Sequence, residues 1–501
     1  MSTKPQINIV WLKRDLRLHD NGAINNALKS SHPSLLLYCF EPMLLNDKHY
    51  SKRHWDFIKQ SLIDLNKALD YYNSKILVVQ SDIIPAINML LESYKISHVF
   101  SHQETGLLVT YNRDKSFQRF CKNNFITWKE NINNGIQRGL KNRDDWNAFI
   151  YTYYAQGQYT FAPMPNQLLH ISDIEHLEKH FKIPSLSTNS DLPFQKGGRT
   201  VGLKYLKSFL EGRYHNYMSH ISKPQDSRTG CSRISPYIAW GNVSVREVYQ
   251  EAQNVKELSV YKKPLEAFLS RLRWQAHFIQ KFEMEHTMEE ASINRGFHKL
   301  KKSVSKAYQT AWKTGKTGYP LIDACMRCLN ETGYLNFRMR ALVVSFFTHN
   351  LWQPWQEATS HLSQMFLDFE PGIHFPQLQM QAGETGVNML RIYNPIKNSL
   401  EHDPEAKFIK KWVPELRHLD TPFAHQPSIM TPLEQEFNNF KLGIDYPNPI
   451  VDLKSSRKIA STALWELRKS PLVIEESKRI LNKHTPRRRF NHAETPNNEA
   501  S

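Results

Sequence analysis

The sequence predicts an N-terminal doubly wound parallel α/β domain, joined by a long connector to a helical C-terminal domain. Three observations lead to this fold class. Short apolar segments alternate with helical stretches near the N-terminus, an irregular region follows, and helical patterning dominates the second half. A chain of 501 residues is also long enough for two or more cores. The expected boundaries are 1–130 for the α/β domain, 131–199 for the connector, 200–484 for the helical domain and 485–501 for a basic flexible tail.

The α/β domain is predicted from the rhythm of its first hundred residues. Between the second and third apolar segments, hydrophobic residues recur at spacings of three and four, which predicts a helix with one face on a sheet. Right-handed crossovers then make the sheet parallel. No glycine-rich dinucleotide or P-loop motif follows a strand. The expected strands are 7–12, 35–40, 75–80 and 98–102, and the helical stripe is Trp55, Ile58, Leu62, Leu65 and Leu69.

The connector is predicted because clusters of Asn, Pro, Gly and Ser interrupt any periodicity there. Beyond it, the helical domain is expected to contain helices within 202–218, 246–255, 264–283, 320–330 and 338–358. The tail carries three consecutive arginines and no apolar period, so we expect weak electrostatic contacts or none from it.

The charge of the chain points to a polyanionic partner. Lys and Arg total 65 against 48 Asp and Glu, a formal net charge of +17. A basic surface that merely maintains solubility is the alternative, and we favour nucleic-acid binding over it. The N-terminus lacks a secretion signal and no apolar run is long enough to span a bilayer. We therefore expect a cytoplasmic protein with no membrane contact.

Five cysteines are too few and too scattered for a disulfide framework. Cys325 and Cys328 form a CxxC pair, but no second pair lies at a spacing that would complete a four-ligand metal site. We interpret these thiols as core residues and expect no metal.

Four segments mix Trp, Arg, acidic and small residues in ways that plain helix packing does not require. In 231–241, serines and Arg233 at a helix start can bind phosphate, or can form an ordinary N-cap. In 270–283, Arg271 and Trp274 share a helix face that suits base stacking or a packing edge with a cation–π pair. Glycine turns in 311–347 permit close approach of a cofactor or of another backbone. In 367–386, buried acids would need Arg338 or Arg340 as a partner.

These segments resemble the DNA photolyase/cryptochrome family. The strings WLKRDLRLHDN at 11–21, CSRISPYIAWG at 231–241, AWKTGKTGYPLIDACMR at 311–327 and TGYLNFRMR at 332–340 are similar to family segments in the right order. The resemblance runs to about residue 417 and implies an FAD cofactor in the helical domain. It also implies damaged DNA as the partner, and an antenna chromophore, folate or deazaflavin, that no short motif identifies. A monomer is expected.

The resemblance also assigns roles to individual residues. Arg340 and Asp368 would form an ion pair beside the isoalloxazine, where a positive charge stabilises the anionic reduced ring. Trp274 matches the tryptophan that stacks on a flipped pyrimidine dimer. His374 aligns with the residue that faces flavin N5, where a histidine would tune protonation near neutral pH. The implied FAD contacts are Tyr217, Cys231, Ser232, Arg233, Ser235, Trp274, Gln275, Tyr334, Arg340, Asp368 and Glu370.

The chain departs from the repair enzymes at several of these positions. Arg271 replaces a carboxylate that hydrogen-bonds the dimer, and Phe337 replaces an asparagine, so two polar contacts to the lesion are lost. These two residues and Trp274 are the expected DNA contacts. Trp312 and Trp355 match members of a tryptophan chain for electron transfer, but the flavin-proximal member is Leu378. Substitutes for it are Trp352, Tyr334 and Tyr393.

Two functions are therefore carried forward. The first is an FAD-dependent, light-driven lyase that splits pyrimidine dimers by electron transfer from reduced flavin, with Trp274, Arg340, Asp368 and His374 at its centre. The second is a cryptochrome-like blue-light photoreceptor without repair activity.

Overall fold

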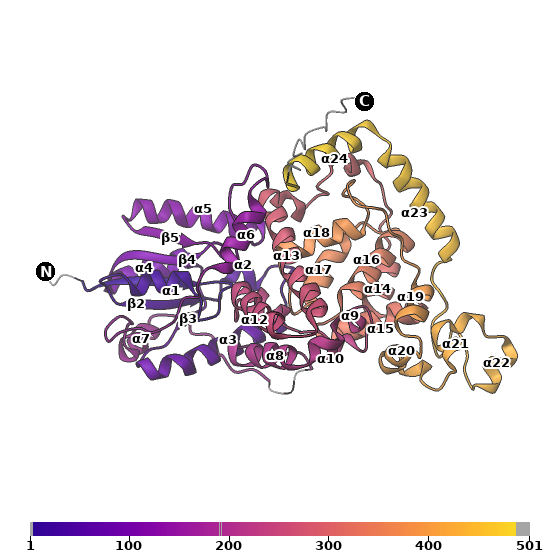
Figure 1. The fold of residues 1–501 in the computed structure, drawn as a ribbon, viewed down its shortest axis with the longest axis horizontal. Coiled ribbons are helices and arrows are strands. Elements are labelled where there is room, and N and C mark those ends of the chain that lie inside the picture. Colours follow the sequence, from indigo (N-terminus) through magenta and orange to yellow (C-terminus); the bar gives the residue numbers. More distant parts are fainter. Residues whose placement is uncertain (1–3, 190, 192, 487–501) are drawn as a thin grey trace, which may run out of the picture.

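The computed structural model describes residues 4–189, 191 and 193–486. Figure 1 shows two parts side by side, a sheet flanked by helices and a larger helical body that ends in the long helices α23 and α24. All but two residues of the expected tail lie outside the described residues.

The N-terminal part is built on five parallel strands in the order β3-β2-β1-β4-β5. The central strand β1 pairs with both β2 and β4, so the chain winds outward from the middle in two directions. This confirms the predicted doubly wound parallel sheet, although the edge strand β5 was not among the expected strands. The strands are β1 (Gln6–Leu12), β2 (Ser34–Cys39), β3 (Leu77–Val79), β4 (Lys95–His102) and β5 (Thr127–Asn131).

Helices cover both faces of this sheet (Figure 1). Alternate side chains of a strand point to opposite faces, and those of β1 divide between two separate cores. Val10 and Leu12 pack with the helices α1 and α3, whereas Ile9 and Trp11 pack with α4, α5 and α7. The helices are α1 (Gly22–Leu28), α2 (Pro42–Leu45), α3 (Lys52–Leu69), α4 (Ile83–Ser93), α5 (Leu108–Asn123) and α7 (Ile171–Glu178).

The predicted apolar stripe forms one face of α3. Its members Ile58, Leu62, Leu65 and Leu69 are buried, and Trp55 is half-buried. Ser51 caps the helix in a capping box with His54 as the partner side chain. The periodicity therefore located both the helix and the face that packs on the sheet.

The expected connector is more ordered than its composition predicts. It contains α6 (Trp146–Ala155) and α7, and Leu168, in the segment before α7, pairs with Ser34 at the start of β2. Ile174 and Leu177 of α7 are buried in the core on one face of the sheet. A helix of eight residues offers too few apolar repeats to reveal a period, which explains why the sequence pattern missed it.

The C-terminal part is helical, as predicted. Its longest helix, α13, spans the middle of the molecule (Figure 1). The helices of at least eight residues are α8 (Arg199–Glu211), α12 (Val245–Leu258), α13 (Lys262–Met284), α14 (Lys306–Thr314), α15 (Pro320–Thr332), α16 (Phe337–Ser345), α17 (Gln356–Met365), α18 (Pro371–Gln381), α19 (Pro395–His402), α23 (Leu453–Arg468) and α24 (Pro471–His484). Shorter helices are α9 (Tyr217–His220), α10 (Ser227–Gly230), α11 (Ser235–Ala239), α20 (Lys407–Trp412), α21 (Thr421–His425) and α22 (Pro432–Phe437).

The helical pattern at 338–358 is interrupted in the structure. Helix α16 passes into a π-helical turn at Phe346–Asn350, and α17 starts only at Gln356. Trp352 in the gap has a positive φ of 53°, and Pro354 disfavours a helical conformation for the residue before it. The pattern of apolar residues alone does not report such a break.

The turn after β1 docks directly onto the helical part. The backbone N–H of Leu16 donates to the carbonyl of Trp240 at 3.2 Å, and the Asn242 side-chain amide donates to the Leu16 carbonyl at 3.2 Å. Gly241 has φ +75°, and a Cβ added there would lie 2.3 Å from the carbonyl oxygen of Arg14. This close approach brings Arg14 of the α/β part into the helical part.

In the part of the chain that the structure describes, no helix combines the length and the apolar character needed to cross a membrane.

Candidate functional site

The centre of the candidate site is the ion pair between Arg340 and Asp368. Asn336 caps α16 by accepting the N–H of Met339, and this fixes the helix that carries Arg340. The Arg340 Nη2 donates to Asp368 Oδ2 at 2.9 Å, and its Nε donates to the Leu335 carbonyl at 2.9 Å. The pair joins α16 to the segment that leads into α18, as the sequence predicted.

The charge state of the Asp368 carboxylate suits a hydrogen-bond acceptor for a donor group of a cofactor. Burial acts to raise the pKa of its carboxyl, but the neighbouring Arg340 outweighs that effect and holds the pKa below its ordinary value. Among the described residues, none hydrogen-bonds the buried oxygen Oδ1. Buried acceptors are normally satisfied, so this carboxylate oxygen fits an N–H donor of a bound cofactor.

His374 lies close to the pair, and its side chain is partly buried. Its Nε2 interacts with the Thr359 carbonyl at 3.1 Å, and its ring packs edge-on against Phe369 and Phe375. Burial, with the further effect of nearby His49, lowers the pKa of His374 to about 3. The ring is therefore neutral near pH 7 in the protein without FAD, and its tuning of the protonation of a bound flavin stays a prediction.

A single glycine allows α18 to approach α13. A Cβ added at Gly372 would lie 2.8 Å from the Cα of Ile279, well inside normal contact. Because α13 also carries Trp274 and Gln275, this packing brings the helix of the expected stacking residue against the helix of His374.

The predicted phosphate segment forms a compact group around Tyr334. Tyr217, Cys231 and Ser232 are buried, and Arg233 lies with its guanidinium carbon 3.7 Å from the centroid of the Tyr334 ring. Burial raises the pKa of Cys231 to about 11, so its thiol stays protonated near pH 7. Ser235 begins α11.

The structure links this group to the ion pair. Ser235 is near enough to Asp368 to help lower the pKa of that carboxyl. Sequence reasoning missed Arg213, which donates to the carbonyl of Thr229 at 2.9 Å and so holds helix α10, directly before Cys231. No periodicity or motif in the sequence indicates that contact.

The three expected DNA-contact residues lie on a shared face. Trp274 and Phe337 are 51% and 42% exposed, so both aromatic rings are accessible to a ligand. The guanidinium carbon of Arg271 lies 4.7 Å from the centroid of the Phe337 ring, and Arg271 precedes Trp274 by three residues on α13. The two departures from the family pattern, Arg271 and Phe337, therefore form one cation–π contact.

The residues of the expected electron-transfer chain are separate from this face. Trp312 and Trp355 are both fully buried, and Leu378 lies buried on α18. Among the suggested substitutes, Trp352 is half-buried with the Lys302 Nζ 4.9 Å from its ring centroid.

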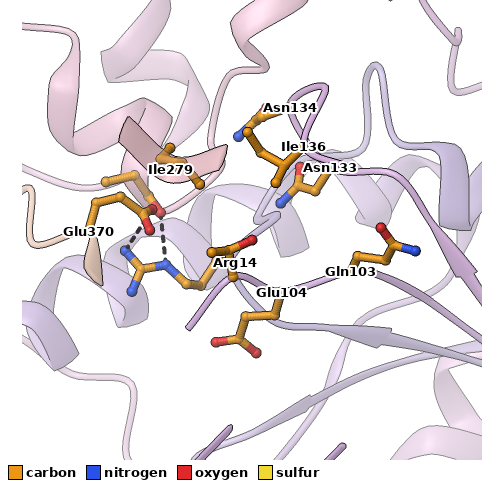
Figure 2. Close-up of a pocket in the computed structure, with 10 residues that line it drawn as sticks. Arg14, Gln103, Glu104, Asn133, Asn134, Ile136, Ile279 and Glu370 are labelled. Atoms are coloured by element: carbon orange, nitrogen blue, oxygen red, sulfur yellow. Dashed lines mark hydrogen bonds and ion pairs between the residues drawn. The ribbon is translucent and has the colours of Figure 1, made fainter. Parts of the chain in front are cut away.

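Glu370 has a partner that the sequence did not predict. Figure 2 shows its side chain reaching Arg14, whose Nη2 lies 3.4 Å from Glu370 Oε2. Burial raises the pKa of the Glu370 carboxyl, and the charge of Arg14 opposes this effect. Both residues line a cavity of about 30 Å³ between the two parts of the molecule, together with Glu104 and Gln103. The pair connects the α/β sheet to the loop that carries Asp368.

Comparisons with known proteins agree with this geometry. The family model described as the FAD binding domain of DNA photolyase matches residues 268–466, and the model described as DNA photolyase matches residues 8–132. The chain belongs to the DNA photolyase/cryptochrome family. It therefore contains the FAD-binding domain of that family, and its ion pair at Arg340 and Asp368 lies within the matched region.

Some relatives of this chain are named photo-lyases and others are named cryptochromes. The chain is 28% identical to a deoxyribodipyrimidine photo-lyase of Alkalihalophilus pseudofirmus, over 92% of this chain and 98% of that protein. It is 27% identical to a cryptochrome DASH of Synechocystis, over 91% and 97%. The crystal structure of a Synechocystis cryptochrome superposes with a TM-score of 0.81 at 22% identity, covering 92% of this chain and all of the other, which supports the shared fold.

Proposed function

We propose that this chain is an FAD-dependent, light-driven DNA repair lyase that splits pyrimidine dimers. The observation that carries the proposal is the placement of Phe337 and Arg340 three residues apart on α16. One helical turn separates an exposed aromatic and cationic face from the ion pair with its unpaired carboxylate oxygen. A lesion on that face would lie close to a cofactor held by the pair.

In this proposal the protein binds and orients the cofactor and the lesion and shields them from solvent. Bound reduced FAD would absorb the light and supply the electron that opens the dimer, and the electron would then return to the cofactor. Arg340 holds positive charge beside the cofactor, and Asp368 accepts a hydrogen bond from it. The proposed FAD contacts are the eleven residues that the family resemblance gave, from Tyr217 to Glu370. His374, neutral near pH 7, faces the same site as an uncharged side chain.

On the DNA side, the formal charge of +17 favours attraction of the phosphate backbone. Trp274 would stack on a flipped base or dimer, since flipping costs least at a lesion that is already unstacked. Arg271 and Phe337 would contact the lesion through flat surfaces in place of a carboxylate and an amide. The proposed boundaries of the domains are those expected from the sequence, with the α/β part as the place of any antenna chromophore.

The second candidate is a cryptochrome-like photoreceptor without repair. It is favoured by the contact between Arg271 and Phe337, which satisfies these two side chains with each other and leaves the polar edge of a dimer with fewer partners. The relatives named cryptochrome support it as much as those named photo-lyase support repair.

One experiment separates the two candidates. The full chain is loaded with FAD, reduced chemically without oxygen, and illuminated with blue light in the presence of an oligonucleotide that carries one cyclobutane dimer. Loss of the dimer under light, and none in darkness, is expected for the lyase. A fully reduced protein that leaves the dimer intact under light would overturn the lyase proposal in favour of the photoreceptor.

A further inference from the structure

Trp355 is the start of a chain of hydrogen bonds that ends at a buried carboxylate. Its indole Nε1 donates to Ser292 Oγ at 3.0 Å, and Ser292 Oγ donates to Glu384 Oε2 at 2.7 Å. The other carboxylate oxygen, Oε1, lies 3.1 Å from Lys302 Nζ. All four side chains are buried or nearly so.

The direction of this chain is fixed by chemistry. An indole N–H can only donate, a serine hydroxyl has a single proton, and an ionised carboxylate can only accept. Ser292 therefore receives the indole hydrogen bond and passes its own proton towards Glu384. A proton that leaves the indole nitrogen of Trp355 therefore has a continuous hydrogen-bonded route through Ser292 to Glu384.

Two other buried tryptophans of the same domain, Trp312 and Trp240, lack such a route. The indole of Trp312 donates to the Val343 carbonyl at 3.1 Å, and that of Trp240 donates to the Leu367 carbonyl at 2.8 Å. A backbone carbonyl accepts a hydrogen bond but does not take up a proton near neutral pH. Of these three indoles, only that of Trp355 faces a group that can keep its proton.

Glu384, the proton acceptor, also lies beside a cavity that can hold water. A cavity of about 240 Å³ is lined by Ser292, Lys302 and Glu384 together with the exposed side chains of His298 and Gln356. It is large enough for several waters, and its polar lining suits them. A proton held on Glu384 can exchange with this space.

The segment that carries Ser292 is tied to the helix of the candidate flavin site. The backbone N–H of Ile293 donates to Gln379 Oε1 at 2.8 Å, and Gln379 follows Leu378 on α18. Trp355 and its proton route therefore adjoin the helix that carries His374, on which the expected proximal tryptophan is missing.

We propose that Ser292 and Glu384 form the proton acceptor of Trp355 when this residue loses an electron to the light-excited, oxidised FAD. This inference rests on the electron-transfer role that the family resemblance implies for Trp355. One electron leaves the indole ring for the excited cofactor, which is the oxidant. The indole N–H bond then breaks, its proton goes to Ser292 Oγ, and the hydroxyl proton of Ser292 goes to Glu384 Oε2. The products on the chain are a neutral Trp355 radical, a serine hydroxyl and a protonated Glu384.

The functional consequence is a longer-lived charge separation. An oxidised indole is far more acidic than a neutral one and is a strong oxidant, so it readily takes its electron back. Once its proton has moved to Glu384, return of the electron also requires return of the proton. Proton capture at Trp355 therefore slows the return of the electron, an effect that further electron-transfer steps between tryptophans would otherwise provide.

The test follows tryptophan radicals by transient absorption after a laser flash, in full-length protein loaded with oxidised FAD. The cation and the neutral radical of tryptophan absorb at different wavelengths, so the deprotonation step is seen directly. In Ser292→Ala and in Glu384→Gln we expect deprotonation of the Trp355 radical to slow by about 100-fold, the usual contribution of a positioned proton acceptor. Trp355→Phe should remove this radical.

Two controls match these variants. Ser363→Ala removes a buried hydroxyl that donates only to its own helix, at the Ser360 carbonyl, and Trp128→Phe removes an indole of the α/β part. Both should leave the radical and its deprotonation rate as in the wild type. Since Glu384→Gln leaves Lys302 unpaired and can destabilise the fold, Ser292→Ala, which keeps that ion pair, is the decisive variant.

A second measurement needs no cofactor. In the protein without FAD, the indole N–H proton resonance of Trp355 should shift and exchange faster with solvent in Ser292→Ala, and not in Ser363→Ala. Wild-type deprotonation rates in Ser292→Ala, or an unchanged radical signal in Trp355→Phe, would overturn the relay. Dimer splitting by chemically reduced wild-type protein is measured separately, so failure of the repair proposal is distinguished from failure of the relay.

Discussion

Replacing Asp368 by Asn tests the centre of the site. The substitution keeps the size of the side chain but removes its negative charge. In the wild type, Oδ2 holds Arg340 at 2.9 Å and Oδ1 has no partner among the described residues. An amide has an oxygen at only one of these two positions, and the NH₂ group at the other position cannot accept from Arg340 or from an N–H donor of FAD. One of the two hydrogen bonds must be lost.

The size of the effect follows from the kind of bond. Hydrogen bonds to charged groups contribute about 1.5–3 kcal/mol. Asp368 is 9% and Arg340 is 30% exposed, so solvent weakens the pair only in part. A loss of about 2 kcal/mol corresponds to a roughly 30-fold weaker FAD affinity. Quenching of flavin fluorescence on binding, titrated with unloaded protein, measures this affinity.

The matched control is Glu415→Gln. Arg327 and Glu415 form another ion pair of similar exposure, 2.7 Å apart at 21% and 25% exposure, away from the candidate site. Glu415→Gln should leave the FAD affinity unchanged within about twofold. If Asp368→Asn also binds FAD with wild-type affinity, the assignment of Asp368 as a cofactor ligand is refuted.

The same residue makes a prediction about pH. The folded pKa of Asp368 lies below its ordinary value of 3.8. Its stabilisation is therefore complete above that value and is lost as the pH falls further through the folded pKa. The difference in unfolding free energy between wild type and Asp368→Asn, from denaturant titrations, should shrink below pH 3.8. A constant difference across that range would show that the ion pair with Arg340 does not lower this pKa.

Three further predictions concern single positions. His374, with a pKa lowered to about 3, should show no ring titration by NMR between pH 5 and 8. Its contribution to stability should fall as the pH drops from 6.5 towards 3, because only the unfolded chain is protonated in that range. A ring titration with a midpoint near pH 6.5 would contradict this. Gly372→Ala should cost about 2 kcal/mol of stability by forcing α13 and α18 apart, whereas Gly212→Ala, with open space around it and φ −176°, should not lower the Tm. Trp274→Ala should weaken binding of dimer-containing DNA by about 1–3 kcal/mol without changing the Tm, and the similarly exposed Trp465→Ala should leave DNA affinity unchanged; equal losses in both would argue against stacking by Trp274.

The fold was predictable where periodic patterns are long. The stripe on α3 repeats over the length of the helix, and each expected strand is a run of apolar residues bounded by turn residues. These signals give a parallel sheet with helices on both faces, because a parallel sheet is buried on both sides. The edge strand β5 has a mixed sequence, TWKEN, with no alternation that would reveal it. Helix α7 is too short to show a period.

The candidate site was predictable only in part. The pairing of Arg340 with Asp368 came from the family resemblance together with the need of a buried acid for a partner. The contact between Arg271 and Phe337 was not predictable, because the two residues lie on different helices, α13 and α16, and no local pattern links them. The contact between Arg14 and Glu370 joins residues 356 positions apart, and no local pattern carries such information. The low pKa of His374 depends on burial, which one sequence does not specify.

The most direct test of the proposed function is the number of dimers split per bound FAD as a function of blue-light dose, with chemically reduced, full-length protein in excess dimer-containing DNA. Because the electron is returned after each cleavage, we expect splitting to continue well beyond one dimer per FAD and to stop when the light is turned off. No splitting under light, or a yield that ends at one dimer per FAD, would contradict the proposed lyase.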